Sequence, residues 1–167
     1  EKVAARLLEL EHFGLQFLRK TRYNKVWDAA RPRLANASTP EEKANALYWF
    51  VQTSFEREDN RGIYARENLD DLFEHNKATP SEMNLLLVAL LREAGVTAHP
   101  VLISTRGHGQ PIPAYPVLDQ FDHVLAGAES DGKLLLLDAG NSFRPPGMLA
   151  IDCLNGAGWV VSEGSPR

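Results

Sequence analysis

Apolar residues recur at loosely helical spacing at the start of the chain, where Leu7, Phe13 and Phe17 are separated mainly by charged and polar side chains. This spacing predicts one or two amphipathic helices over residues 1–35. We therefore treat residues 1–37 as an N-terminal helical segment.

A better marked helix begins at residues 39–42, which read Thr-Pro-Glu-Glu. A threonine hydroxyl, a proline in the first turn and a glutamate three residues after the cap together satisfy the free amides of a helix start. Apolar residues such as Leu47 then keep to one face, so we expect a helix on a core that ends near Phe55. Residues 56–77 are more polar and predict a long connection with one short helix around 68–74.

The same start signal recurs at residues 79–82, Thr-Pro-Ser-Glu, and Gly95 supplies a stop. The predicted helix spans about residues 80–94. Its run Leu85–Leu91 is apolar on every side, and a helix without a polar face has to be buried. We expect this to be the central helix of the domain.

Beyond Gly95 the pattern changes to short runs rich in Val, Ile and Leu, which predict strands. Pro100 cannot donate a ladder hydrogen bond, so we expect it at a sheet edge, a bulge or a strand start. Residues 105–120 hold two glycines and three prolines and predict a long irregular loop. A Ser-Asp-Gly turn at 130–132 predicts a hairpin. The predicted strands are 97–104, 121–126, 133–138 and 158–161.

Helices first and hairpin-linked strands afterwards is the order typical of an α+β domain, with helices on one face of a mostly antiparallel sheet. The length of 167 residues, with 44% hydrophobic and 24% charged residues, suits one globular domain over residues 1–167. The chain begins at Glu1 without an initiator methionine or a signal pattern, from which we expect a piece cut from a larger protein.

Charge and composition argue against some classes of binding partner. The chain holds 18 basic and 22 acidic residues, with a net charge of −4 and a pI of about 5.7, whereas nucleic-acid-binding domains usually have a pI above ~9. The longest apolar run, Leu85–Leu91, is far shorter than the ~20 residues of a membrane span. The single cysteine, Cys153, allows neither an internal disulfide nor a multi-cysteine zinc site. We expect no nucleic-acid partner and no transmembrane segment in this chain.

Three positions combine into a candidate site: Pro80 at the start of the buried helix, His123 in a strand and Asp138 at the end of an apolar strand. Each alone has an ordinary explanation, since a strand histidine is usually a surface or satisfied core residue and an aspartate before Ala-Gly-Asn usually starts a turn. Their combination is what suggests chemistry.

The helix sequence SEMNLLLVALLREAGV at 81–96, followed by FDHV at 121–124 and the apolar strand that ends in Asp138, resembles the transglutaminase-like superfamily. It is most similar to the bacterial branch found inside larger proteins, over about residues 38–161. The resemblance implies a papain-like α+β fold with a triad of a cysteine at the helix start, then a histidine and an aspartate from following strands. His123 matches the family histidine, and Asp138 matches the family aspartate.

The family's cysteine position falls on Pro80, which has no nucleophile but suits the first turn of a helix. Ser81, one residue on, is turned by ~100° about the helix axis, away from the line of the nucleophile. Cys153 lies far downstream, where a buried inert thiol is the commoner case. Asp122 replaces the family's asparagine before His123, and a second carboxylate beside the imidazole suits a bound anion or a structural ion pair better than a thiolate partner.

The resemblance and the missing cysteine predict an inactive domain that works as a binding or structural module in a larger bacterial protein. Its partners would be neighbouring domains of the same chain, or a protein or peptide ligand, and the family suggests a periplasmic or cell-surface location. The alternative is a residual cysteine-protease-like or acyl-transfer enzyme with a non-standard nucleophile.

The expected site is the relic pair His123 and Asp138, with Ser81, Asp122 and His108 as candidate binding residues. The five histidines show no ligand spacing among themselves, so we expect no metal site and no cofactor. A site made of His108, His123 and Asp138 would require the loop around His108 to close over the strands.

Overall fold

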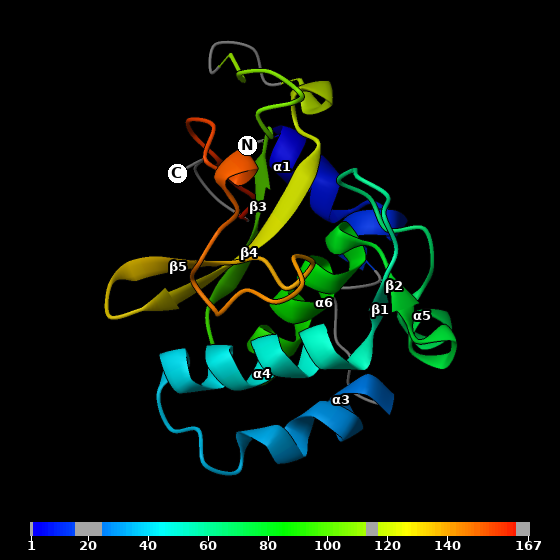
Figure 1. Ribbon diagram of the computed structural model, residues 1–167, viewed down its shortest axis with the longest axis vertical. Coiled ribbons are helices and arrows are strands. Elements are labelled where there is room, and N and C mark those ends of the chain that lie inside the picture. Colours follow the sequence, from blue (N-terminus) through cyan, green and yellow to red (C-terminus); the bar gives the residue numbers. More distant parts are fainter. Residues whose placement is uncertain (1, 16–24, 113–116, 163–167) are drawn as a thin grey trace.

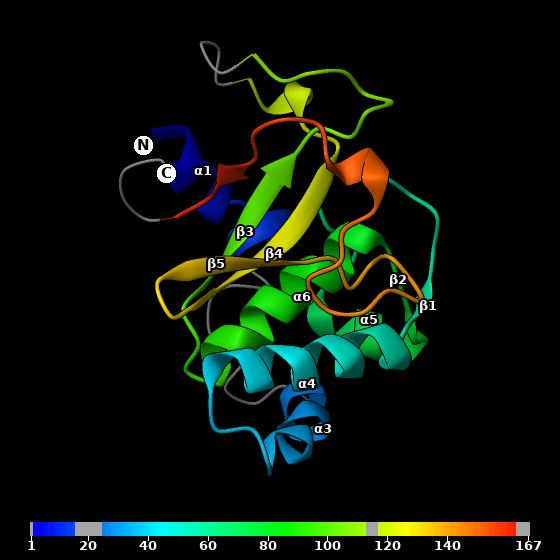
Figure 2. The ribbon, with the colours of Figure 1, turned by 60° about the vertical axis from the view of Figure 1, so that its left-hand side comes forward.

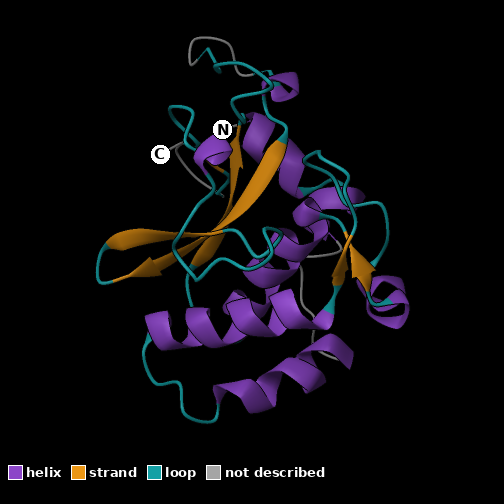
Figure 3. Cartoon of the chain, viewed as in Figure 1, coloured by secondary structure: helices purple, strands orange, loops and turns teal. Residues whose placement is uncertain are grey.

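Helix α6 (Pro80–Glu93) lies at the centre of the molecule in this computed structural model (Figures 1 and 2). It packs between helix α4 (Pro40–Ser54) on one side and strands β3 (Ala98–Ile103) and β4 (His123–Ser130) on the other. The structure describes residues 2–15, 25–112 and 117–162. The predicted α+β class is correct, with the helices gathered against one antiparallel sheet (Figure 3).

Both long helices begin as the sequence predicts. Thr39 Oγ1 accepts a hydrogen bond from Glu42 N at 3.2 Å, and Glu42 Oε2 accepts one from Thr39 N at 3.0 Å. Thr79 and Glu82 repeat this reciprocal cap at the start of α6, at 3.3 and 2.8 Å. Gly95, with φ of +78°, follows the end of α6 in the left-handed conformation that glycine adopts without strain.

Helix α6 is buried along almost its whole length. Every residue from Pro80 to Leu91 is buried, as expected for a helix with no polar face. Helix α4 contributes Leu47, Tyr48 and Val51 to the same core. The central helix is therefore fixed from both sides, which gives the residues of its first turn defined positions.

The N-terminal segment forms shorter pieces than the one or two helices predicted. Within the described residues it consists of α1 (Lys2–Leu8), a π-helical turn η1 (Glu11–Leu15), α3 (Lys25–Ala30) and a 3-10 turn η2 (Arg31–Leu34). Pro32 inside η2 lacks an amide hydrogen and so cannot continue the regular hydrogen bonding of α3.

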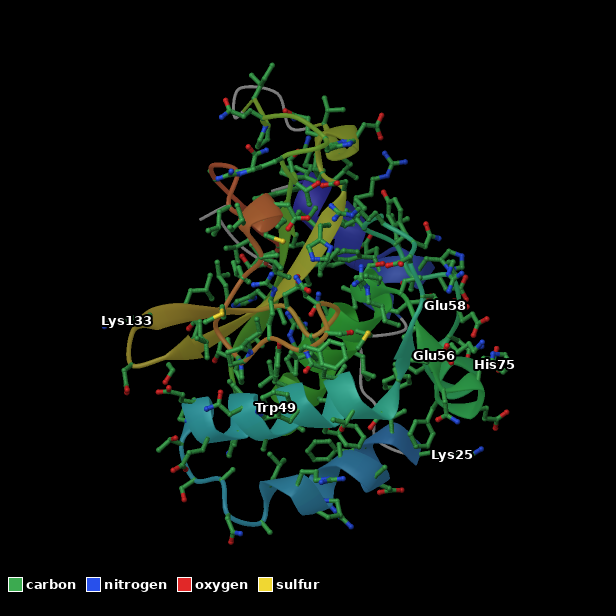
Figure 4. The ribbon with its side chains drawn as sticks, viewed as in Figure 1. Lys25, Trp49, Glu56, Glu58, His75 and Lys133 are labelled. Carbon is green, nitrogen blue, oxygen red and sulfur yellow. The ribbon has the colours of Figure 1, made fainter. Side chains whose placement is uncertain are left out.

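Between α4 and α6 the structure contains the predicted short helix and a feature that the sequence did not reveal. Helix α5 (Leu69–His75) matches the expected 68–74, and Lys25 of α3 reaches it through an ion pair with Glu74 at 2.8 Å (Figure 4). Strands β1 (Glu56–Arg57) and β2 (Lys77–Ala78) form a parallel pair. Two residues are too few to show the alternation by which a strand is recognised.

The main sheet has the strand order β5-β4-β3-β6, with every neighbouring pair antiparallel. Strand β5 (Lys133–Leu137) and strand β6 (Trp159–Val160) match the predicted runs. The predicted hairpin joins β4 to β5 through Asp131 and Gly132, both at positive φ, and Lys133 lies at its tip (Figure 4). The loop before β4 is irregular in its described part except for a 3-10 turn, η3 (Leu118–Gln120).

The expected position of Pro100 is wrong. Strand β3 is an inner strand, its register with β4 is continuous, and Pro100 is the third of its six residues. Val161 N donates to Pro100 O at 2.8 Å, and the N and O of one strand residue point to the same side. The proline nitrogen therefore faces the end of β6, where it cannot donate the second hydrogen bond of the pair with Val161, and the register with β6 covers only Val101 and Leu102.

The chain after β5 folds back over the sheet. Its 3-10 turn η4 (Ile151–Cys153) lies in this segment, and Ala150 and Cys153 pack with Val101, Ile103 and Leu125 of the sheet. Leu102 and Val124 belong instead to the core around α6. This return carries Cys153 to the sheet ends where His123 and Asp138 lie. None of the helices formed by the described residues is long and apolar enough to cross a membrane.

Candidate functional site

His123 and Asp138 are joined by a hydrogen bond, as the hairpin predicts. His123 opens β4, and Asp138 follows β5 directly. The register pairs Ala126 with Leu137, so one further step places Asp138 beside Leu125 and diagonal to His123. His123 Nε2 and Asp138 Oδ2 are 3.0 Å apart, and both residues are buried.

Asn84 of α6 ties this pair to the central helix. Its Nδ2 donates to Asp138 Oδ1 and to Val124 O, each at 2.8 Å, and its Oδ1 accepts from Ala139 N at 2.8 Å. The sequence analysis missed this residue. The available signal was a side-chain amide directly before the apolar run 85–91 of a helix expected to be buried, because a buried amide needs partners.

The surroundings of Asp138 favour its charged form. Burial raises the pKa of the carboxyl, but the hydrogen bond and charge of His123 and the hydrogen bond from Asn84 outweigh that effect, and the pKa lies below its ordinary value. Tyr48 also donates its hydroxyl to Asp138 O at 3.2 Å and to Arg144 O at 2.9 Å. Burial raises the pKa of Tyr48 to about 12, so it acts as a neutral donor.

Pro80 lines the same cavity as His123 and Asp138. The backbone of Gly140 packs directly against it. A Cβ on Gly140 would lie 2.5 Å from Pro80 Cα and 2.6 Å from Pro80 Cβ, closer than real carbon atoms approach. The first turn of α6 and the segment after β5 therefore touch at a position that only glycine permits.

Cys153 lies beside the pair, which the sequence analysis did not anticipate. Its Sγ is 3.9 Å from Asp138 Oδ2 and 3.7 Å from Asp152 Oδ1. One ring nitrogen of His123, one carboxylate oxygen of Asp138 and this sulfur all lie within 4.8 Å of one another. Burial, followed by the charges of Asp138 and Asp152, raises the pKa of the thiol to about 12, so it is protonated at neutral pH.

Two of the candidate binding residues lie away from the cavity. Ser81 is buried, donates to Tyr64 O at 3.2 Å and is not part of the cavity lining. His108 is exposed on its loop, with Nε2 at 2.8 Å from Asp119 O. His108 therefore does not join His123 and Asp138 in a metal site. Cys153 is the third residue that lies beside this pair.

Asp122 contacts two residues that line the cavity. Its carboxylate accepts hydrogen bonds from Thr105 N at 2.7 Å and from Thr105 Oγ1 at 2.6 Å, and Arg61 approaches to 3.8 Å. Thr105 and Arg61 both line the cavity. The described partners of the Asp122 carboxylate are thus Thr105 and Arg61, and its expected effect on the His123 imidazole stays a prediction.

The cavity has a volume of about 240 Å³ and a largely polar wall. Arg61 at its edge forms an ion pair with Asp152 at 2.7 Å. The buried lining residues are Pro80, Thr105, His123, Asp138, Gly140, Ala150 and Cys153, and the more exposed ones are Arg57, Arg61, Asn141, Arg144 and Asp152. Cationic and hydrogen-bonding groups surrounding a buried imidazole can hold an anionic or polar ligand.

A buried helix that leads into an antiparallel sheet, with a strand histidine and an aspartate joined close to the helix start, defines the papain-like class of α+β proteins. The family model of the transglutaminase-like superfamily matches residues 28–141. The chain belongs to this superfamily, as its helix and strand motifs predicted.

Of two solved structures that align with this chain, the first supports the fold. The chain aligns with a proposed protease from Parabacteroides distasonis at a TM-score of 0.59 and 17% identity, over 86% of this chain and 26% of that one. A structure of a TGase aligns at a TM-score of 0.49 and 14% identity, over 75% of this chain and 35% of that one. The chain thus spans 26% and 35% of the lengths of these two proteins. A search of curated proteins finds no match.

Proposed function

We propose that the chain is a non-catalytic transglutaminase-like domain that serves as a binding or structural module in a larger bacterial protein. One observation carries this proposal: Pro80 occupies the first turn of the buried helix, where the family pattern calls for a cysteine. The supporting pair His123 and Asp138 is nevertheless hydrogen bonded beside it. The scaffold of the site is kept while its reactive atom is missing.

The chemistry of a helix start explains why this loss is decisive. Free amides at a helix N-terminus carry a partial positive charge that lowers the pKa of a thiol placed there. Proline supplies neither a thiol nor an amide hydrogen. The backbone of Gly140 also packs on this residue, so the space in front of the first turn is partly filled by the protein itself.

The cavity gives the domain a means of binding. Arg57, Arg61 and Arg144 surround it, and these guanidinium groups suit an acidic side chain or a chain terminus of a neighbouring domain or a peptide. The limited share of the Parabacteroides protein that the chain spans is in keeping with one domain among several. The family resemblance alone suggests a periplasmic or cell-surface location.

A residual enzyme that uses Cys153 is the second candidate, because this sulfur lies within 4.8 Å of the other two groups. It would predict amine incorporation into a glutamine donor, or peptide cleavage, that disappears in Cys153→Ala. The primary proposal predicts no such activity in the purified chain. Activity that depends on Cys153 would therefore replace the first candidate by the second.

The carry-over of the family's nucleophile position to Pro80 can be tested by placing a thiol there. In a Cys153→Ser background, Pro80→Cys should show a lower midpoint in the pH dependence of iodoacetamide alkylation than Pro40→Cys. Pro40 is the control for a helix start, since it begins α4 behind the same kind of cap; unlike Pro80 it is exposed and has no histidine assigned to it. The difference should vanish when His123→Ala is added. Equal midpoints for the two introduced thiols would show that Pro80 is not the nucleophile position.

A further inference from the structure

Three side chains of metal-binding type converge from separate parts of the chain. His123 comes from the start of β4, Asp138 from the end of β5 and Cys153 from the turn η4. One ligand atom from each lies within 4.8 Å of the others, and all three residues are buried. Among the described residues this is a compact cluster of three different donors, nitrogen, oxygen and sulfur.

The spacing of these atoms is close to that of a tetrahedral zinc site. Zinc binds cysteine sulfur at ~2.3 Å and histidine nitrogen or carboxylate oxygen at ~2.0–2.2 Å, so neighbouring ligand atoms lie about 3–4 Å apart. Here His123 Nε2 is 3.0 Å and Cys153 Sγ is 3.9 Å from the same atom, Asp138 Oδ2. The third pair, the His123 nitrogen and the Cys153 sulfur, lies within 4.8 Å, so the side chains have to rotate for all three atoms to reach one ion.

We propose that His123, Asp138 and Cys153 bind a Zn²⁺ ion, with the fourth coordination position open to the cavity. This inference goes beyond the proposed function and does not depend on it. Nitrogen and thiolate donors favour zinc over magnesium or calcium, which prefer oxygen. On binding, the Cys153 thiol releases its proton to solvent and becomes a thiolate ligand.

Hydrogen bonds orient the carboxylate of Asp138 in the way that is usual for carboxylates that bind metals. Asn84 donates to Oδ1 at 2.8 Å, which leaves Oδ2 as the oxygen that His123 and Cys153 approach. Asn84 is itself fixed by Val124 O and Ala139 N. Such outer hydrogen bonds orient metal-binding carboxylates and are part of the affinity of a site.

The charges around the cluster permit a divalent cation. A carboxylate and a thiolate together neutralise Zn²⁺, so the loaded site adds no net charge to the interior. Of the arginines that line the cavity, Arg61 is paired with Asp152 at 2.7 Å and lies 3.8 Å from Asp122. Arg57 is paired with Asp59 at 2.8 Å. The cavity of about 240 Å³ has room for a water or a ligand group at the fourth position.

The test uses the single cysteine of the chain as a reporter. After chelator treatment and dialysis, the purified chain is titrated with Co²⁺, which occupies zinc sites and gives a sulfur-to-cobalt charge-transfer band only when a thiolate is a ligand. We expect a band that saturates at one equivalent and is removed by Zn²⁺. We also expect Zn²⁺ to protect Cys153 from iodoacetamide until a chelator is added. The absence of the band and of protection in the folded wild-type chain would overturn the proposal.

Variants then identify the other ligands. In Cys153→Ala and His123→Ala, the affinity for Zn²⁺ should fall by more than the ~10–100-fold that loss of a residue supporting a ligand costs. His108→Ala is the matched control, because its histidine is exposed and lies outside the cluster, and it should bind Zn²⁺ like the parent. Affinity unchanged in His123→Ala, or lost in His108→Ala, would contradict the assignment. Circular dichroism of each variant verifies that it is folded. If a variant does not fold, the Co²⁺ titration of the wild-type chain alone tests whether the site binds a metal.

Discussion

At the scale of single residues, Asp138 has the densest set of interactions in the site. Its carboxylate faces His123 and Asn84, and its carbonyl accepts from Tyr48. All these groups are at least partly buried, so water cannot replace a lost partner freely. The contribution of Asp138 to the free energy of unfolding can therefore be measured without a ligand.

We expect Asp138→Ala to lower the free energy of unfolding by about 1–3 kcal/mol, because it leaves buried polar groups of His123 and Asn84 without their partner. The melting temperature, followed by circular dichroism in the presence of a chelator, should fall by several degrees, at ~2–4 °C per kcal/mol in a domain of this size. Glu67→Ala is the control, since Glu67 and His75 form a similar pair at 3.0 Å on the surface. Exposed pairs contribute little, so equal effects of the two variants would disprove the buried role of Asp138.

At the scale of elements, the two helix caps are the same motif in two environments. Glu42 of α4 is exposed and accepts from Ser38 N and Thr39 N. Glu82 of α6 is fully buried, and besides its own cap it accepts from the backbone amides of Arg66 and Glu67. One glutamate thus serves a helix start, and the other also holds the connection that precedes α6.

Glu82→Ala should therefore destabilise the protein more than Glu42→Ala does. Loss of Glu82 leaves three buried or half-buried amide groups without an acceptor, at a cost of about 1–3 kcal/mol for each group that water does not reach. Water can replace the carboxylate of Glu42. Urea denaturation of both variants at neutral pH gives the comparison, and a larger loss in Glu42→Ala would contradict this explanation.

The exposed cap also predicts a pH dependence. Hydrogen bonds from the backbone amides of Thr39 and Ser38 lower the pKa of Glu42 below its ordinary value of 4.5. A carboxyl whose pKa is lowered on folding stabilises the protein fully above its unfolded pKa, and this contribution is lost as the pH falls through the folded pKa. The stability difference between wild type and Glu42→Ala should thus be constant near pH 7 and shrink below pH 4.5. A difference that grows in acid would show the opposite sign of the shift.

At the scale of the whole molecule, the contact between Gly140 and Pro80 joins the start of α6 to the segment that returns over the sheet. Gly140→Ala should destabilise by about 1–3 kcal/mol, as overpacking of a tight contact does. Gly107→Ala is the control, because nothing lies within 4 Å of a Cβ at that position.

Adding Pro80→Ala to Gly140→Ala should not restore stability, because the clash involves Pro80 Cα as well as the ring. Thermal melting of the single and double variants measures this. Full recovery in the double variant would show that an alanine Cβ at position 140 clashes only with the proline ring and not with the Cα of residue 80, which lies 2.5 Å from that Cβ position.

Features that depend on neighbouring residues can be predicted from the sequence. The caps at Thr39 and Thr79 place two helix starts, because capping involves atoms within three residues. The apolar run of α6 predicts its burial, and the turn at Asp131 sets the hairpin that brings His123 and Asp138 together. Local chemistry was enough for these features because each is completed within one element or one hairpin.

Contacts between residues that are distant in sequence depend on how the elements pack. Cys153 reaches His123 and Asp138 because the segment after β5 returns over the sheet, and no local pattern records the path of a return. Asn84 becomes a partner of Asp138 because α6 packs on β4, across a separation of 54 residues. Pro100 is tolerated in an inner strand because its neighbour β6 is only two residues long. These contacts follow from the packing of whole elements, which fixes atoms that are far apart in sequence and which periodicity cannot encode.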